Sequence, residues 1–272
     1  MDSPVLLDAG VVSRCRRRVH LDHDPESAEA PRAAPDPAVE QRIADAAAHR
    51  RTIADSLARY CQDEWAEVSL DGSVPDRIAA TCRALAEGKP FVWGGVLPPD
   101  GAAGRRGGVE LLVRYRGGYL PVIVVRHKVT DPGAGARTSP LARPLPAAAQ
   151  LDPQRRVRPQ PRDQLRLAHV VRLLQAAGLA AAGPARGGVI GLDADVVLWH
   201  DLVAPTWPGG RSAMAEYDAR FADRIAIARA AVAGSEPLAQ PSRITECRSC
   251  PWWPTCGAAL QATRDVSLVL RG

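Results

Sequence analysis

Lysine, aromatic residues and long apolar runs are all scarce in this sequence. Lysine stands at only two of its 272 positions, Lys89 and Lys128, and aromatic residues make up 4% of the chain. No apolar run reaches the roughly 18 residues that a membrane-spanning helix needs, which excludes a helical membrane protein. The opening residues, MDSPVLLDAGVV, carry no basic cluster before their apolar positions, as a secretory signal would. We therefore expect a cytoplasmic protein with no membrane partner.

The residues that are abundant indicate an ordinary globular protein with a basic balance. Hydrophobic residues make up 46% and charged residues 24% of the chain, as is typical of globular domains. A chain of this length can form one large domain, or one domain with a small appendage. The net charge of +5 permits an acidic partner such as nucleic acid. Charge alone is a weak indication here, because arginine and alanine are over-used throughout, a bias typical of GC-rich coding.

The order of the predicted helices and strands indicates an α/β fold. Apolar residues at three- and four-residue steps predict helices, and short apolar runs predict strands. The predicted helices cover residues 38–67, 74–85, 163–177 (capped by Asp163) and 213–233. The predicted strands cover residues 91–97, 109–115 and 119–129, with a hairpin turn at 116–118, and a pair within 189–202 that turns at Asp193 and Ala194. A Pro- and Ala-rich linker is expected at 25–37 and a long loop at 130–162, where Pro, Gly and Arg crowd together.

Cysteine is scarce as well, and half of it is concentrated near the end of the chain. Three of the six cysteines lie in the stretch ECRSCPWWPTC, as Cys247, Cys250 and Cys256. In a cytoplasmic protein such clustered thiols hold a metal more often than they form a disulfide. Three thiolates are one short of the four that zinc or a cubane iron–sulfur cluster takes. A distant residue must therefore supply the fourth ligand.

Cys15 is the best candidate for that fourth ligand. It lies in a run of arginines and histidines, whereas Cys61 and Cys82 lie within predicted helices among apolar neighbours, where a buried free thiol is the ordinary state. A centre held by Cys15 and the three later cysteines would tie the first element of the chain to the last. The tryptophans and prolines at 251–254 would then screen the sulfurs from water, which favours an iron–sulfur centre. Zinc, or no metal at all, are the alternatives.

One N-terminal cysteine followed, after a nuclease-like core, by C-x2-C-x5-C resembles the RecB-like PD-(D/E)XK nucleases with an iron–sulfur staple. This family includes the CRISPR adaptation exonuclease and the C-terminal nuclease of the AddB helicase partner. The resemblance implies a restriction-endonuclease-like core, in which helices flank a mixed central sheet, and a [4Fe–4S] cluster on Cys15, Cys247, Cys250 and Cys256. It implies one domain over residues 1–260. Residues 261–272 are expected to begin a further element that leads to a partner domain in a longer chain.

The resemblance also implies a metal-dependent nuclease site. In this family, carboxylates on two adjacent strands hold Mg²⁺ or Mn²⁺, and a lysine stabilises the charge that develops at phosphorus. Glu110 takes the position of the family's Asp in the first strand of a hairpin, and His49 lies mid-helix, where the family carries a metal-binding histidine. Lys128 takes the position of the catalytic lysine, and Gln164 resembles the substrate-contacting glutamine of the D-x-x-QL motif. Taken alone, His49 is also typical of a structural histidine, and Lys128 of a solvated lysine at a strand end.

The second strand of the hairpin departs from the family pattern. With Lys128 as the lysine of E-x-K, the acidic position is occupied by Arg126, which cannot bind a cation and would repel one. Arg126 is therefore expected to contact the substrate. In the other possible register the two positions hold Ile123 and Val125. Asp131, just beyond the strand, is the carboxylate that could substitute.

These observations lead to two main hypotheses for the function. The first is metal-dependent hydrolysis of DNA in repair or recombination, weakened or lost because the E-x-K motif is incomplete. The second is a non-catalytic module that binds single-stranded nucleic acid or its ends for a separate catalytic domain. In this second hypothesis, the arginines of residues 14–18 and 137–162 grip the phosphates. A purely structural iron–sulfur domain is a third alternative.

Overall fold

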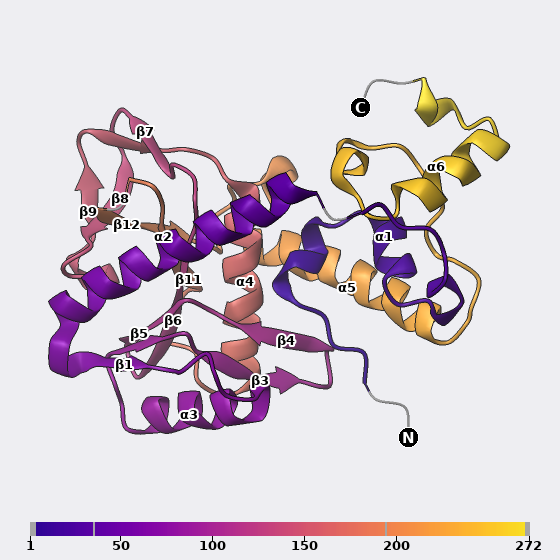
Figure 1. Cartoon of the computed structure of the whole chain (residues 1–272). Coiled ribbons are helices and arrows are strands. Elements are labelled where there is room, and N and C mark those ends of the chain that lie inside the picture. The colour runs from indigo at the N-terminus through magenta and orange to yellow at the C-terminus, as the bar shows by residue number, and fades with distance from the viewer. Residues whose placement is uncertain (1–3, 35, 194, 270–272) are drawn as a thin grey trace. The chain divides into compact units, whose positions relative to one another are not determined.

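The computed structural model describes residues 4–34, 36–193 and 195–269 (Figure 1). Its helices are α1 (Arg16–Leu21), α2 (Pro37–Cys61), α3 (Val74–Ala86), α4 (Pro161–Ala176), α5 (Ala213–Val232) and α6 (Trp253–Ala262). Its strands are β1 (Trp65–Glu67), β2 (Phe91–Trp93), β3 (Val96–Asp100), β4 (Arg105–Gly108), β5 (Leu111–Tyr115), β6 (Gly118–Val124), β7 (Thr130–Pro132), β8 (Ala136–Pro140), β9 (Gln150–Asp152), β10 (Arg155–Val157), β11 (Arg186–Ile190) and β12 (Val196–Asp201). The predicted α/β class is confirmed.

The chain divides into two compact units, whereas the sequence prediction treated residues 1–260 as one domain. Unit 1 contains Gly10–Ile43 and Ala219–Gly272 with the first residues of the chain, and unit 2 contains Leu6–Ala9 and Ala44–Asp218. Two of the four boundaries, at 43/44 and 218/219, fall within the long helices α2 and α5. No helix in the described ranges has the length and apolarity to cross a bilayer.

Unit 2 is built on a mixed sheet of eight strands in the order β1-β2-β5-β6-β11-β12-β8-β9. Strands β2, β5 and β6 are antiparallel neighbours, and β11 runs parallel to β6 after the intervening helix α4. A parallel pair needs such a crossover, because a short turn can join only antiparallel strands. Two further pairs, β3–β4 and β7–β10, stand outside the main sheet.

Helices α2 and α4 cover opposite faces of the central strands. Alternate residues of β5 and β6 pack with Ile53 and Leu57 of α2, which runs across one face of the sheet (Figure 1). The residues between them, such as Leu112 and Ile123, are equally buried but point to the other face. There α4 packs on β6 and β11. These two helices therefore border the edge of the sheet where β5 begins and β6 ends.

The predicted hairpin of β5 and β6 is confirmed, and its turn explains the local sequence. Tyr115 pairs with Gly118, so Arg116 and Gly117 form a two-residue loop, and both have positive φ, at 46° and 79°. Paired positive φ values are those of the turn that matches the twist of a hairpin, and glycine adopts them without strain. The hairpin of β11 and β12 is confirmed as well, although Ala194 in its predicted turn lies outside the described residues.

Three sequence predictions are wrong in detail. Residues 130–162 contain four short strands rather than a loop, because short two-stranded pairs and edge positions tolerate Pro and Arg better than a central strand does. The helix predicted to reach residue 67 ends at Cys61, where β1 follows. The strand predicted at 91–97 is broken by Gly94, whose φ of 69° redirects the chain between β2 and β3.

Helix α4 also begins earlier than predicted. It starts at Pro161, a residue well suited to the first turn, and Asp163 does not cap it. Asp163 is buried and instead pairs with Nε2 of His127 at 2.9 Å. Burial raises the pKa of this carboxyl group, while His127 opposes the shift.

Unit 1 brings α1, the C-terminal part of α5 and α6 together (Figure 1). Its core is small: Leu21, Cys250 and Trp252 are buried against one another, with Ala30 and Cys256 packed alongside. The Pro- and Ala-rich stretch predicted as a linker contributes to this packing, because Ala33 donates its N–H to the Pro251 carbonyl. A short segment of 3₁₀ helix, Thr245–Ser249, carries the first of the three clustered cysteines.

Candidate functional site

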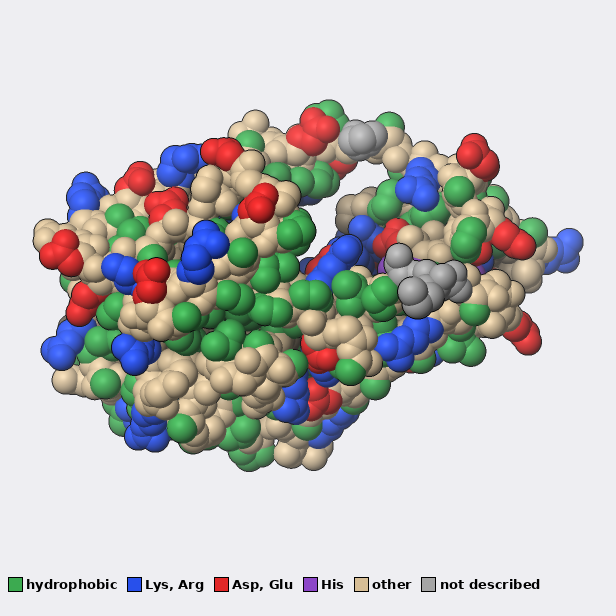
Figure 2. All heavy atoms as spheres, turned by 90° about the horizontal axis from the view of Figure 1, so that it is seen from below, with side chains coloured by type: hydrophobic (Ala, Val, Ile, Leu, Met, Phe, Trp, Pro, Cys, Tyr) green, Lys and Arg blue, Asp and Glu red, His purple; other side chains and the backbone are tan. Residues whose placement is uncertain are grey.

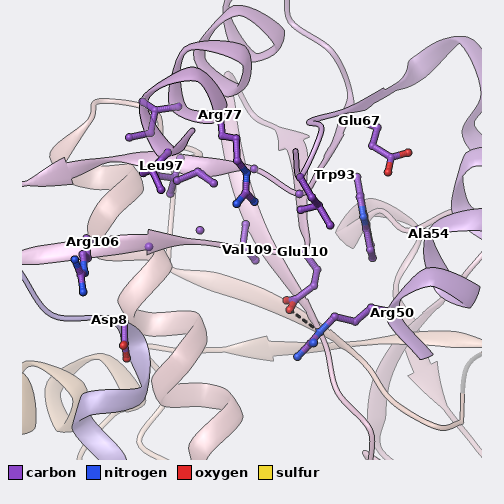
Figure 3. A pocket seen from close by; sticks show the side chains of 18 of the residues that line it. Asp8, Arg50, Ala54, Glu67, Arg77, Trp93, Leu97, Arg106, Val109 and Glu110 are labelled. Atoms are coloured by element: carbon purple, nitrogen blue, oxygen red, sulfur yellow. Dashed lines mark ion pairs between the residues drawn. The ribbon is translucent and has the colours of Figure 1, made fainter. Parts of the chain in front are cut away.

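A cavity of about 770 Å³ opens in unit 2 beside the start of β5 (Figure 3). This volume lies within the range of pockets that bind small molecules. Its walls come from α2, α3, β2, the glycine-rich chain between β2 and β4, and α4. The charged residues that line it are Arg50, Arg51, Arg77, Arg106, Arg166, Asp8, Asp55, Glu67 and Glu110.

Glu110 lies at the centre of this charge cluster, immediately before β5. Its side chain is only 10% exposed, and its Oε1 lies 2.6 Å from Nη2 of Arg166 and 3.1 Å from Nε of Arg50. The backbone N–H of Val124, at the end of β6, donates to Oε2 at 3.3 Å. The carboxylate predicted to hold a metal is thus bound by two guanidinium groups from the two helices that flank the sheet.

The neighbouring strand brings no second acid to Glu110. Leu111 pairs with Val122, which places Ile123 opposite Glu110, and Ile123 is fully buried. The positions beside the carboxylate therefore correspond to the register with Ile123 and Val125, and the E-x-K pair is absent there. An arginine is always protonated and cannot ligate a cation. This arrangement favours an anion in the cavity over a metal ion.

The other residues predicted for catalysis and substrate binding lie outside the cavity lining. Lys128 is exposed in the segment after β6, and Arg126 pairs with Asp45 of α2 at 2.8 Å. The carbonyl Oε1 of Gln164 accepts a hydrogen bond from Nε1 of Trp207 at 3.0 Å. Only Glu110 of the proposed catalytic group lines the cavity in the described part of the chain.

His49 and Asp131 also lie away from the cavity lining. His49 is partly buried in α2, and its Nε2 has no hydrogen-bond partner among the described residues. Asp131 lies in β7, where Nη1 of Arg158 stands 3.6 Å from its Oδ1. Neither is brought to Glu110 in a way that would complete a metal site.

A buried hydrogen-bonded chain supports the strand β4 that forms one wall of the cavity. Nε of Arg105 donates to the Tyr217 hydroxyl oxygen at 3.1 Å, and that hydroxyl lies 2.8 Å from Nδ1 of His169. Nε2 of His169 lies 3.0 Å from the carbonyl oxygen of Arg106. Because a carbonyl only accepts, Nε2 must carry the proton, and Nδ1 accepts from the tyrosine. With His169 neutral in this tautomer, each of the three hydrogen bonds has one donor and one acceptor.

Unfolding is expected to become easier as the pH falls, because of His169. Burial lowers the pKa of His169 to about 4 from its ordinary value of 6.5. The stability that the neutral ring contributes is full above pH 6.5 and falls between there and the folded-state pKa, because only the unfolded state takes up the proton. The total loss is up to about 3 kcal/mol. Urea unfolding measured across this window should show the decline. His169→Gln, which does not titrate, should reduce the decline by about half, because burial lowers the pKa of His200 to about 4 as well; an unchanged slope in that variant would contradict the contribution of His169.

The four cysteines predicted as ligands line one small pocket in unit 1. Cys15, Cys247, Cys250 and Cys256 share it with Arg17, Arg18, Ser242, Glu246 and Trp253. The Cys15 N–H donates to Glu246 Oε2 at 2.6 Å, and Nη1 of Arg18 lies 3.0 Å from Glu246 Oε1. These contacts hold residue 15 against a segment more than 200 positions away in the sequence. The juxtaposition that the staple hypothesis requires is present.

The sulfurs are close enough to influence one another. Burial raises the pKa of the Cys256 thiol to about 11; Arg17 opposes the shift, and the thiols of Cys250, Cys15 and Cys247 add to it. The space among the side chains is about 10 Å³, roughly the room of one water molecule. Across the described residues, however, no group of three or more His, Cys, Asp or Glu side chains has the arrangement of a formed metal site.

The arginine run at residues 14–18 is used within unit 1. Nη2 of Arg16 lies 2.9 Å from Asp223, Arg17 donates to the Ala239 carbonyl at 3.4 Å, and Arg18 pairs with Glu246. These three guanidinium groups therefore pack and pair internally. The prediction that this run grips nucleic-acid phosphates gains no support from its contacts.

Sequence reasoning missed the arginines of the cavity. Arg50 directly follows His49, and Arg166 lies two positions after Gln164, so both stand beside residues that the motif selected. In an arginine-rich chain nothing in the sequence marks these two as paired with Glu110.

Comparisons with models of protein families, with curated proteins and with solved structures found no match.

Proposed function

We propose that this chain is a nuclease-fold domain of the RecB-like type that binds single-stranded nucleic acid without cutting it. Its hairpin β5–β6 with an acid at the start of β5, the helix α4 that follows, and the parallel strand β11 support the fold assignment. The observation that carries the non-catalytic function is the pairing of Glu110 with Arg166 and Arg50. The guanidinium groups of Arg50 and Arg166 pair with the carboxylate on which the family would hold Mg²⁺ or Mn²⁺.

Five arginines line the cavity, whereas the basic groups on the surface are mixed with acidic ones (Figure 2). In the face seen in Figure 2, Lys and Arg side chains alternate with Asp and Glu side chains. In residues 137–162, Arg155 pairs with Asp152 and Asp195, and Arg158 stands near Asp131. A mixed surface of this kind attracts a polyanion weakly, because opposite charges cancel within a screening length. The cavity arginines are the stronger phosphate ligands.

The proposal includes a metal centre on Cys15, Cys247, Cys250 and Cys256. Four thiols with no imidazole or carboxylate among the donors suit a [4Fe–4S] cluster or a zinc ion. Trp252 is fully buried beside Cys250 and Trp253 lines the pocket, so water is excluded from the Cys250 sulfur, whereas Cys15, Cys247 and Cys256 are partly exposed. Exclusion of water favours the cluster, whereas the small space suits a single ion without rearrangement. Either centre would supply structural cross-linking between the two ends of unit 1.

The test is a binding and cleavage assay with labelled single-stranded DNA and Mg²⁺ or Mn²⁺. We expect retention of the DNA, no cleavage product, and affinity that falls with salt. Arg50→Ala and Arg166→Ala should each weaken binding and reduce the salt slope by about 0.7 for each phosphate contact removed. Cleavage that disappears in Glu110→Gln would show an active nuclease and overturn the proposal.

The matched control is Arg59→Ala. Arg59 is exposed on the same helix as Arg50 but does not line the cavity. Arg59→Ala removes one positive charge from α2, as Arg50→Ala does, so the affinity of this variant for DNA should stay close to that of the wild type. An equal loss in Arg59→Ala would mean that net charge, and not the cavity, binds the DNA.

A further inference from the structure

The buried part of the cavity has more cation than anion. Arg50, Arg77 and Arg166 are partly buried, and so are two of the carboxylates among the lining residues that the structure describes, Asp8 and Glu110. The other acids of the cavity, Asp55 and Glu67, are exposed, so water screens them. Three guanidinium groups and two carboxylates are therefore partly buried in this cavity.

Two of these guanidinium groups have unsatisfied donors. Nε of Arg50 and Nε of Arg77 are both buried, and neither has a hydrogen-bond partner among the described residues. Arg50 Nε does lie 3.1 Å from Glu110, but its N–H is not directed at the carboxylate. A buried donor without a partner costs about 1–3 kcal/mol, so the acceptors of the protein leave these two guanidinium groups only partly satisfied. Figure 3 shows Arg77 from α3 and Arg50 from α2 extending into the same cavity.

The remaining wall of the cavity is apolar and flat. Trp93, Ile78 and Leu97 line it, together with the backbone of Gly94, Gly95, Gly107 and Gly108. One face of the Trp93 ring is stacked on Trp65, with the ring centroids 5.8 Å apart, which holds the indole in place. Glycines without side chains let a planar group approach the backbone closely. Aromatic and aliphatic groups beside arginines are the surroundings that a nucleobase with its phosphate requires.

We infer that this cavity binds one nucleoside phosphate, with the phosphate on Arg50, Arg77 and Arg166 and the base against the wall that contains Trp93. Phosphate oxygens accept bidentate hydrogen bonds from guanidinium groups, so the arginines that line the cavity suit a phosphate. A volume of about 770 Å³ accommodates a single nucleotide rather than a length of strand. The inference rests on the proposed function and deepens it: the site recognises a phosphorylated strand end or a free nucleotide.

The test compares one short oligodeoxynucleotide with a 5′-phosphate, with a 3′-phosphate and with neither, and adds free nucleoside monophosphate as a competitor. We expect one phosphorylated form to bind about tenfold or more tightly than the unphosphorylated form. Arg77→Ala should abolish this preference, and Arg77→Lys should restore it only in part, because lysine lacks the planar fork. Arg83→Ala, on the same helix outside the cavity lining, is the control and should keep the preference.

The outcomes separate this inference from the proposed function. Equal affinity for all three oligonucleotides, unchanged by Arg77→Ala, overturns the nucleotide site while nucleic-acid binding stands. Competition by free nucleotide identifies the free form as a ligand, and preference without competition identifies the strand end; both support the site. Binding of free nucleotide with no binding of any oligonucleotide refutes the nucleic-acid function alone. No binding of any probe refutes both.

Discussion

If unit 1 holds the proposed metal centre, replacing Cys15 by serine is expected to remove it and to destabilise that unit. Cys15 lines the same pocket as Cys247, Cys250 and Cys256, so the substitution leaves three thiols for a centre that takes four. A serine hydroxyl is a hard ligand that does not replace a thiolate on zinc or iron–sulfur iron. Metal analysis should show the loss of zinc or iron, and a brown protein should lose its absorbance near roughly 400 nm.

The stability effect should be large, because the cross-link spans almost the whole sequence. Residues 15 and 246 already touch across 231 positions, and a cross-link over so long a loop contributes about 5 kcal/mol in the chain-entropy account. Hydrogen exchange should therefore accelerate in residues 10–34 and 242–262. The contacts of Glu246 with the Cys15 N–H and with Arg18 remain in the variant, so faster exchange would report the loss of the metal link itself.

Cys82→Ser is the matched control for this experiment. Cys82 is a partly buried cysteine on α3 of unit 2, and it does not line the thiol pocket. Metal content and exchange in unit 1 should stay as in the wild type. Full metal content in Cys15→Ser, with loss in neither variant, would refute the four-thiol centre. Zinc without iron in the wild type would instead identify the centre as the zinc form.

The parts of the fold that sequence predicted are those in which local pattern and tertiary packing agree. Helix α3 was predicted almost to the residue, because Ser73 caps it and its C-terminus precedes Gly88. The β5–β6 hairpin followed from two apolar runs around Arg116 and Gly117. The pairings β8–β9 and β7–β10 could not be predicted, because strands of three to five residues rich in Arg and Pro carry no periodicity. Their partners, and not their composition, make them strands.

The candidate site was predicted in part for a similar reason. Spacing predicts the group of Cys247, Cys250 and Cys256, and the helical setting of Cys61 and Cys82 leaves Cys15 as the fourth cysteine; the structure brings all four to one pocket. Glu110 follows from its place in the first strand of the predicted hairpin. The partners of Glu110 depend on which faces of α2 and α4 meet the sheet edge, and that is a property of packing. Lys128 takes the position of the family's catalytic lysine in the sequence, but in the structure it does not line the cavity, and its side chain is exposed.

Replacing Trp252 by alanine is expected to cost unit 1 about 3–5 kcal/mol, the usual effect of removing a buried tryptophan. Trp252 is fully buried, and it forms the small core of the unit with Leu21 and Cys250. Its Nε1 donates to Oδ1 of Asp22 at 2.7 Å, and the guanidinium of Arg32 lies 4.0 Å from its ring. A core this small has few other side chains that could move to fill the cavity left by the ring. Hydrogen exchange in residues 245–262 and the rate at which a chelator extracts the metal should both increase.

Trp252→Phe separates the ring from its hydrogen bond. The phenyl ring retains most of the buried area beside Cys250 but leaves Asp22 without the indole donor, so the expected cost is about 1–3 kcal/mol. If the tryptophan protects the sulfurs by excluding water, chelator extraction should stay slow in Trp252→Phe and become fast in Trp252→Ala. Equal acceleration in both variants would assign the protection to the Asp22 bond that fixes α1. Slow extraction in both would show that Trp252 does not shield the centre, and the water-excluding role would then pass to Trp253, which lines the pocket directly.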